Sequence, residues 1–228
     1  MDGNRKLNSK QIKAIPVELP VIPPKNSFIL GDCMDYLPLF PPNFFDLAIV
    51  DPPYGMDKSS TNGAGKLKHR ALNRLNTDWD KSPPDEYFKQ LFRVSSNQII
   101  WGGNYFNLPP TRGFIIWDKK QFLPTFSRCE YAWTSYYKPA KMFEWDNAST
   151  DKIHPTQKPV ELYKWILRDY AKAGDLILDT HVGSASSLIA CTELGFDYIG
   201  FEKDEEYYTM AKSRLGRATR KYELFEAV

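Results

Sequence analysis

Short apolar runs alternate with amphipathic segments over most of this chain of 228 residues. Runs that are rich in Ile, Val, Leu and aromatic residues and are bounded by turn residues predict buried strands, whereas helical periodicity of apolar residues predicts helices. The predicted strands are 27–30, 45–50, 98–106, 114–119, 129–134, 176–178 and 196–201. The predicted helices are 34–40, 84–94, 160–170, 186–193 and 205–217. This alternation is typical of an α/β protein with a mostly parallel sheet.

Three stretches lack this periodicity. Residues 1–26 are polar and then proline-rich, which predicts an irregular N-terminal arm ahead of a single domain at 27–228. Residues 55–83 carry many basic side chains, and a loop of this length is often functional. We expect this basic insertion to cover a site or to grip phosphates, the alternative being a solvated disordered insert. Residues 136–150 form an aromatic connection of mixed charge.

The predicted strand at 45–50 runs directly into Asp51-Pro52-Pro53-Tyr54. Ligand sites of open α/β sheets lie beyond the carboxyl ends of the strands. Because proline has no N–H, the carbonyls of Asp51 and Pro52 remain available as acceptors beside the carboxylate and the flat ring of Tyr54. These groups suit a planar ligand that bears an NH2, such as adenine or cytosine; the alternative is a strand-ending turn with an acidic cap.

A second pattern, of strand, small-residue turn, helix, strand and terminal acid, covers 176–202. It predicts a nucleotide-binding βαβ unit, with the turn at Gly183-Ser184 open to a ligand and Glu202 placed to take ribose hydroxyls. Glu202 could instead be a strand-end acid bonded to the next helix, and His181 could be a packed structural histidine or a cofactor contact. The turn lacks the Gly-x-Gly-x-x-Gly of dinucleotide enzymes.

Composition narrows the class of protein without identifying it. The formal net charge of +2 does not by itself demand a nucleic-acid partner. Cys33, Cys129 and Cys191 form no Cys-x-x-Cys pair, and the three histidines lack metal-ligand spacing, so we expect a reducing compartment and no metal site. No apolar run approaches the roughly 20 residues that span a bilayer. We expect a cytoplasmic protein without a membrane partner, encoded by a bacterium or a phage.

The order of the motifs is more specific than either motif alone. Asp-Pro-Pro-Tyr comes at 51–54, His-Pro-Thr-Gln-Lys-Pro at 154–159, and the glycine turn follows. This order resembles that of the amino DNA methyltransferases of the permuted, or beta, class over residues 28–215. The resemblance implies a Rossmann-like S-adenosylmethionine-dependent methyltransferase fold, with a seven-stranded, mostly parallel sheet and one antiparallel strand. It also implies double-stranded DNA as partner, a place in DNA methylation and restriction-modification, and a possible homodimer.

The resemblance also assigns roles to individual residues. The catalytic candidates are Asp51, Pro52, Pro53 and Tyr54. The cofactor candidates are Asp32, Cys33, Asp51, Thr156, Gln157, Lys158, Asp179, His181, Gly183, Ser184, Glu202 and Lys203. The DNA-binding candidates come from the charge of the basic insertion and not from the resemblance: Lys66, Lys68, His69, Arg70 and Arg74. His181 and Ala185 depart from the family turn, where phenylalanine and glycine are usual, and the recognition segment at about 136–150 is short.

The expected reaction is methyl transfer to the exocyclic amine of a flipped-out base, with adenine N6 preferred. For that reaction, the Asp-Pro-Pro-Tyr motif and the glycine turn must meet in one pocket. The alternatives are a cytosine-N4 DNA methyltransferase and a non-catalytic DNA-binding protein that retains the fold. A protein-glutamine methyltransferase fits the motif order less well, and a dinucleotide oxidoreductase is disfavoured by the altered glycine pattern.

Overall fold

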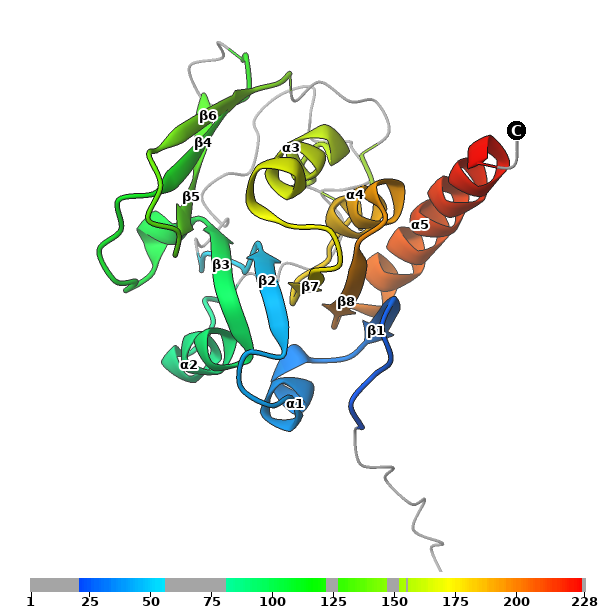
Figure 1. Ribbon diagram of the computed structural model, residues 1–228, viewed down its shortest axis with the longest axis horizontal. Coiled ribbons are helices and arrows are strands. Elements are labelled where there is room, and N and C mark those ends of the chain that lie inside the picture. The colour runs from blue at the N-terminus through cyan, green and yellow to red at the C-terminus, as the bar shows by residue number, and fades with distance from the viewer. Residues whose placement is uncertain (1–20, 56–80, 122–126, 147–151, 155, 227–228) are drawn as a thin grey trace, which may run out of the picture.

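The computed structural model describes residues 21–55, 81–121, 127–146, 152–154 and 156–226 (Figure 1). These residues form an eight-stranded sheet of order β1-β8-β7-β2-β3-β5-β4-β6. The strands are β1 (Ser27–Leu30), β2 (Phe45–Val50), β3 (Ser95–Trp101), β4 (Phe114–Asp118), β5 (Cys129–Thr134), β6 (Lys141–Glu144), β7 (Leu176–Asp179) and β8 (Asp197–Glu202). Among them β5 alone is antiparallel to its neighbours, β3 and β4, which confirms the single reversed strand.

The strand count differs from the seven that the resemblance implies. The additional strand is β6, which pairs in parallel with β4 at the edge of the sheet, inside the segment expected to be a connection. It is short, and only Met142 and Phe143 lie between its charged ends. Such a run is too short and too polar to show a strand period, so the pairing with β4 was not predictable from local pattern.

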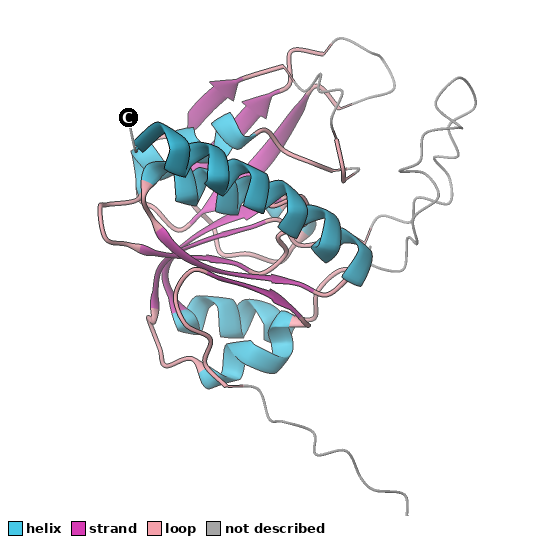
Figure 2. Ribbon diagram, turned by 90° about the vertical axis from the view of Figure 1, so that its right-hand side faces the viewer, coloured by secondary structure: helices cyan, strands magenta, loops and turns pink. Residues whose placement is uncertain are grey.

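Helices cover both faces of the sheet (Figure 2). Helices α1 (Cys33–Tyr36) and α2 (Asp85–Val94) contribute to one core cluster, and α3 (Val160–Tyr170), α4 (Ser186–Leu194) and α5 (Glu205–Glu226) to another. In β2, Leu47 and Ile49 belong to the cluster of α3 to α5, whereas Ala48 and Val50 belong to the cluster of α1 and α2. A strand buried on both faces requires the nearly continuous apolar run seen in the sequence.

One predicted strand and one predicted helix end at other residues than expected. The strand expected at 98–106 stops at Trp101, because Gly102 adopts a left-handed conformation (φ +67°) and Gly103–Tyr105 forms a 3-10 turn, η5. The last helix continues to Glu226 rather than ending near Arg217, since no proline interrupts it. Within the described residues, no helix is both long and apolar enough to cross a membrane.

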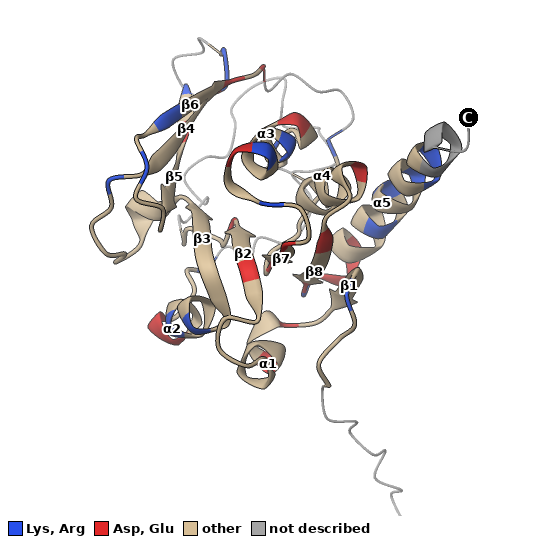
Figure 3. Cartoon of the chain, in the orientation of Figure 1, with Lys and Arg blue, Asp and Glu red and all other residues tan. Residues whose placement is uncertain are grey.

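The sheet topology determines where a site can form. Strands β1, β8, β7 and β2 are neighbours and run in parallel, so their carboxyl ends share one edge. That edge is followed in the chain by Asp32, Asp51 and His181, and it includes Glu202 at the end of β8. Positions of acidic residues on β2, β7 and β8 are coloured red in Figure 3. Residues far apart in the sequence are thereby brought together beyond this edge.

Candidate functional site

A cavity of about 800 Å³, including the solvent at its mouth, lies at this edge of the sheet. Asp51 and Pro53 of the first motif line it together with Gly183 of the second, so the two halves meet in one pocket as expected. Among the cofactor candidates, all except Asp179 line the cavity: Asp32, Cys33, Asp51, Thr156, Gln157, Lys158, His181, Gly183, Ser184, Glu202 and Lys203.

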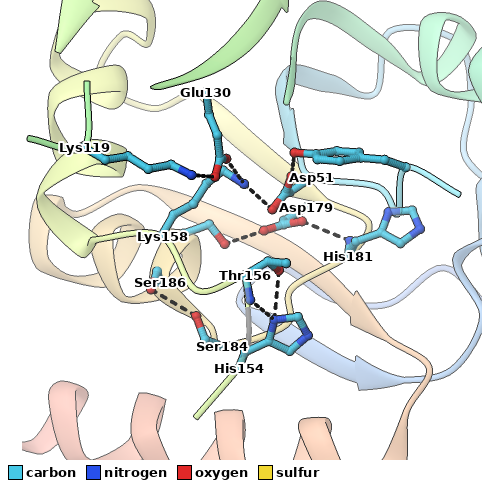
Figure 4. Close-up of polar contacts among 12 residues, drawn as sticks. Asp51, Lys119, Glu130, His154, Thr156, Lys158, Asp179, His181, Ser184 and Ser186 are labelled. Atoms are coloured by element: carbon cyan, nitrogen blue, oxygen red, sulfur yellow. Dashed lines mark hydrogen bonds and ion pairs between the residues drawn. The ribbon is translucent and has the colours of Figure 1, made fainter. Parts of the chain in front are cut away.

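The carboxylate of Asp51 is held from two sides (Figure 4). The Tyr54 hydroxyl donates to Asp51 Oδ1 at 2.7 Å, and the Lys158 ammonium forms an ion pair with Oδ2. Burial, together with the adjacent Asp51 charge, raises the pKa of Tyr54 well above its ordinary value, so the phenol stays a donor. An ionised carboxylate can accept about four hydrogen bonds, so Asp51 keeps acceptor capacity beyond these two contacts.

The ring of Tyr54 belongs to an aromatic group with Tyr105 and Phe106. It stacks on Tyr105 with ring centroids 4.9 Å apart and an interplanar angle of 19°, and it meets Phe106 edge-on at 6.1 Å. Gly102 lies against the same ring, since a Cβ there would come within 2.1 Å of Tyr54 Cε1. Residue 102 must therefore be glycine for Tyr54 to lie where it does.

The turn after β7 contains two left-handed residues, Gly183 (φ +53°) and Ala185 (φ +63°). Its Gly183 N–H donates to Glu202 Oε2 at 2.8 Å. Alanine pays about 1–2 kcal/mol for a left-handed conformation that glycine adopts freely. The glycine-to-alanine departure therefore costs backbone energy, but Ala185 still adopts the left-handed conformation directly before α4.

The position of Glu202 is compatible with both interpretations that the sequence left open. Its Oε1 accepts from the N–H of Asp204, just ahead of α5, so it does bond to the start of the next helix. It also lines the cavity, where burial raises the pKa of its carboxyl. Asp32, also on the cavity wall, caps α1 by accepting from Met34 N at 2.9 Å. Each carboxylate retains lone pairs for hydroxyl or amino groups of a ligand.

Asp179 supports the turn from beneath. It is buried, accepts from the Ser187 hydroxyl through Oδ2 and accepts from His181 N at 3.0 Å through Oδ1. Burial, with a smaller contribution from the charges of Asp51 and Glu202, raises its pKa from 3.8 to about 7. Its position indicates a structural part in the turn.

The raised pKa of Asp179 predicts a pH dependence of stability. Between its ordinary pKa and about 7, the folded protein holds a proton that the unfolded chain has lost. The resulting stabilisation is complete below the ordinary pKa and is lost as pH rises toward 7. Asp179→Asn removes this titration. The free energy of unfolding of the variant, measured in urea, should therefore rise relative to that of the parent as the pH is raised from about 4 to about 7.

The neighbouring His181 provides an internal check. Burial lowers its pKa to about 4, so its own contribution to stability changes with pH in the opposite direction. That contribution is common to the parent and to Asp179→Asn, and it cancels in their difference. A difference that does not vary with pH would contradict the assignment to Asp179.

The position of His181 is compatible with both interpretations from the sequence, a packed structural histidine and a cofactor contact. Its Nδ1 lies 2.9 Å from Thr180 Oγ1, and its ring packs edge-on against Tyr87, as a structural histidine would. It nevertheless lines the cavity and, with its lowered pKa, is neutral near pH 7. The second histidine on the wall, His154, packs on Tyr207 with ring centroids 4.3 Å apart and was not assigned from the sequence.

Sequence reasoning also missed Glu130 and Lys119. Glu130 lies in β5 and forms ion pairs with Lys158 at 3.1 Å and with Lys119 at 2.5 Å. The signal was present, because an acid in a strand that is otherwise mostly buried needs a partner. The partner could not be identified, since Lys158 is distant in sequence. Lys66, Lys68, His69, Arg70 and Arg74 lie outside the described residues.

The cavity fits S-adenosylmethionine by its donor set. Asp32 and Glu202 offer carboxylates for the adenosine part, and Thr156 and Gln157 present polar groups from the opposite motif. We therefore expect the adenosine near the carboxyl ends of β1 and β8. Within the described residues, no group of three or more His, Cys, Asp or Glu side chains could hold a metal ion.

Known proteins resemble this chain in sequence and fold. Type II methyltransferase M2.DpnII of Streptococcus pneumoniae is 27% identical, over 84% of this chain and 90% of its own. The solved M1.HpyAVI–SAM complex is 18% identical with a TM-score of 0.56, over 82% of this chain and 98% of its own. PvuII DNA methyltransferase, described as cytosine-N4-specific, is 14% identical with a TM-score of 0.55, over 89% and 93% of the two chains.

These likenesses confirm the fold class expected from the motif order, apart from the strand count. A family pattern described as DNA methylase matches residues 100–213, from the end of β3 into α5, and so includes the His-Pro-Thr-Gln-Lys-Pro motif and the glycine turn. Because this match covers half of the sequence, the chain belongs to the N6/N4 family of DNA methylases.

Proposed function

We propose that this chain transfers a methyl group from S-adenosylmethionine to the exocyclic amine of a flipped-out base in double-stranded DNA, with adenine N6 as the preferred target. One observation supports this above the others: Asp51 and the turn at Gly183 line the same cavity. A methyl donor held on the turn would thereby face a base held at Asp51. The family depends on S-adenosylmethionine, which when bound supplies an electrophilic methyl group on a sulfonium.

The acceptor groups of the motif address the weakness of the nucleophile. An exocyclic amine is a poor nucleophile because its lone pair is delocalised into the ring. Asp51 and the Pro52 carbonyl each accept one amine hydrogen in this proposal, which favours a pyramidal nitrogen. The contribution of the protein is then alignment and electrostatic stabilisation. The two contacts that fix the Asp51 carboxylate, from Tyr54 and Lys158, reduce the reorganisation this requires.

Tyr54 offers a stacking surface for the base. A target amine inside a duplex is inaccessible, so the nucleotide must leave the stack. Stacking of a base on an aromatic side chain contributes about 1–3 kcal/mol, which offsets part of the unstacking cost. The Tyr54 ring is already oriented by Tyr105, Phe106 and Gly102.

The preference for adenine rests on the first residue of the motif. Asp51 is the residue more common among the adenine enzymes of the family it resembles, whereas serine is more common among those that act on cytosine. The fold does not separate the two, because the cytosine-N4-specific PvuII enzyme shares it. We treat 27–228 as one domain and place the DNA backbone contacts on Lys66, Lys68, His69, Arg70 and Arg74.

The identity of the product tests this proposal. The full chain is incubated with double-stranded DNA and S-adenosylmethionine, and the digested nucleosides are analysed by mass spectrometry. N6-methyladenine is the expected product. N4-methylcytosine as the sole product would overturn the preference for adenine. Cofactor binding by calorimetry without any methylated base would overturn the hypothesis of a catalytic methyltransferase in favour of a non-catalytic DNA-binding protein.

A further inference from the structure

A row of four alternating charges ends at Asp51. Lys119 follows β4, Glu130 lies in β5, Lys158 belongs to the segment before α3, and Asp51 follows β2. Lys119 Nζ lies 2.5 Å from Glu130 Oε1, Lys158 Nζ lies 3.1 Å from Glu130 Oε2, and Lys158 also pairs with Asp51 Oδ2. Figure 4 shows the four side chains pointing toward one another in this order.

Lys158 is the most deeply buried member, with 1% of its side chain exposed. Its ammonium lies 5.1 Å from the centre of the Trp101 ring, which supplies no anion. Burial alone would lower the pKa of Lys158, but Asp51 and Glu130 raise it above the ordinary value. Burial would likewise raise the pKa of Glu130, yet Lys158 and Lys119 hold it below the ordinary value. The pairing therefore keeps Lys158 and Glu130 in their charged forms, each balanced by its partners.

Glu130 can influence the reaction through Lys158 without contacting the base itself. Lys158 forms ion pairs with two carboxylates, and one of them is the acceptor that must meet the substrate amine. Without the Glu130 charge, Asp51 would be the carboxylate left to Lys158 among the described residues. Lys158 would then bind Asp51 more tightly and withdraw acceptor capacity from it.

We propose that Glu130 is a positioning residue, which restrains Lys158 and so keeps the Asp51 carboxylate available to the substrate amine. This rests on the proposed function, because it assigns Asp51 to the amine. Lys119 sets the strength of the restraint, since it competes with Lys158 for Glu130. Removing the charge at residue 119 should therefore leave the restraint on Lys158 in place.

The test compares Glu130→Gln, Lys119→Met and the double variant in single-turnover methylation of DNA. Glu130→Gln should lower the turnover rate about tenfold or more, with KM for cofactor and DNA changed less than about twofold. Lys119→Met should have little effect in the parent. Lys119 acts on Lys158 through the Glu130 carboxylate, so in the Glu130→Gln background the same change should alter the rate by less than about twofold. Glu144→Gln, whose partner Lys120 is exposed, is the control.

The outcomes separate this inference from the proposed function. No methylated base from the parent chain would refute the proposed function itself. An active parent with an unaffected Glu130→Gln would refute only the role of Glu130. Both single changes break the Lys119–Glu130 ion pair, so a merely structural role of that pair predicts similar damage from each. A Lys119→Met variant that loses as much activity as Glu130→Gln would therefore also overturn the proposal. Cofactor binding by calorimetry verifies that each variant is folded.

Discussion

Asp51→Ala is expected to lower the rate of methyl transfer by about a hundredfold or more, the range seen when one preorganised catalytic hydrogen-bonding group is removed. The substitution takes away both oxygens of the acceptor carboxylate. It also leaves the Tyr54 hydroxyl without its 2.7 Å partner and the buried Lys158 with Glu130 as its one remaining carboxylate. The expected loss is in the chemical step, because the carboxylates of Asp32 and Glu202 on the cofactor side of the cavity remain in place.

The measurement is a single-turnover assay with labelled S-adenosylmethionine, together with calorimetric titration of the cofactor. Cofactor affinity should change much less than the rate. Asp197→Ala is the matched control, because Asp197 also belongs to the parallel part of the sheet but pairs with Lys25 and Asn26 on the surface. Methylation by Asp51→Ala at the parental rate would refute the role given to Asp51.

The meeting of Asp51 and Gly183 was predictable from sequence because both follow buried strands. Carboxyl ends of parallel neighbouring strands share one edge of a sheet, and β2 and β7 are such neighbours. The strand at 129–134 was likewise predicted, and it is the antiparallel β5. Each of these predictions rests on a local pattern combined with a general rule of topology.

The partners of Lys158 were not predictable in the same way. The motif resemblance assigned Lys158 to the cofactor, and it does line the cavity, yet its ion pairs are with Asp51 and Glu130. Nothing in the local sequence around residue 158 or residue 130 specifies that pairing. It depends on β5 entering the sheet between β3 and β4, which brings a side chain of the reversed strand toward the end of β2.

The position of Tyr54 was also beyond sequence reasoning, because Gly102 was read as part of a strand. In the structure Gly102 ends that strand and lies against the Tyr54 ring. A glycine in a strand pattern can mark a close approach of another group to the backbone, which is the signal that was available. The approach itself depends on the tertiary packing of Tyr105 and Phe106 around the ring.

Gly102→Ala should therefore damage the site although residue 102 carries no functional side chain. The new Cβ would lie 2.1 Å from Tyr54 Cε1, far inside contact distance, and the ring is confined by Tyr105 and Phe106. Tyr54 must move, and its hydrogen bond to Asp51 should break. We expect about a tenfold to hundredfold loss of methyl transfer and a higher KM for DNA, because stacking and alignment are both disturbed.

The backbone cost of alanine at residue 102 has to be distinguished from the clash between the new Cβ and the Tyr54 ring. Alanine at the left-handed φ of +67° costs about 1–2 kcal/mol wherever it occurs. Gly195→Ala is the matched control, because Gly195 has a φ of +72° and no neighbouring atom within 4 Å of its added Cβ. Both variants should lose free energy of unfolding in urea, but only Gly102→Ala should lose activity. Equal activity of the two would show that contact between Gly102 and Tyr54 does not hold the ring for catalysis.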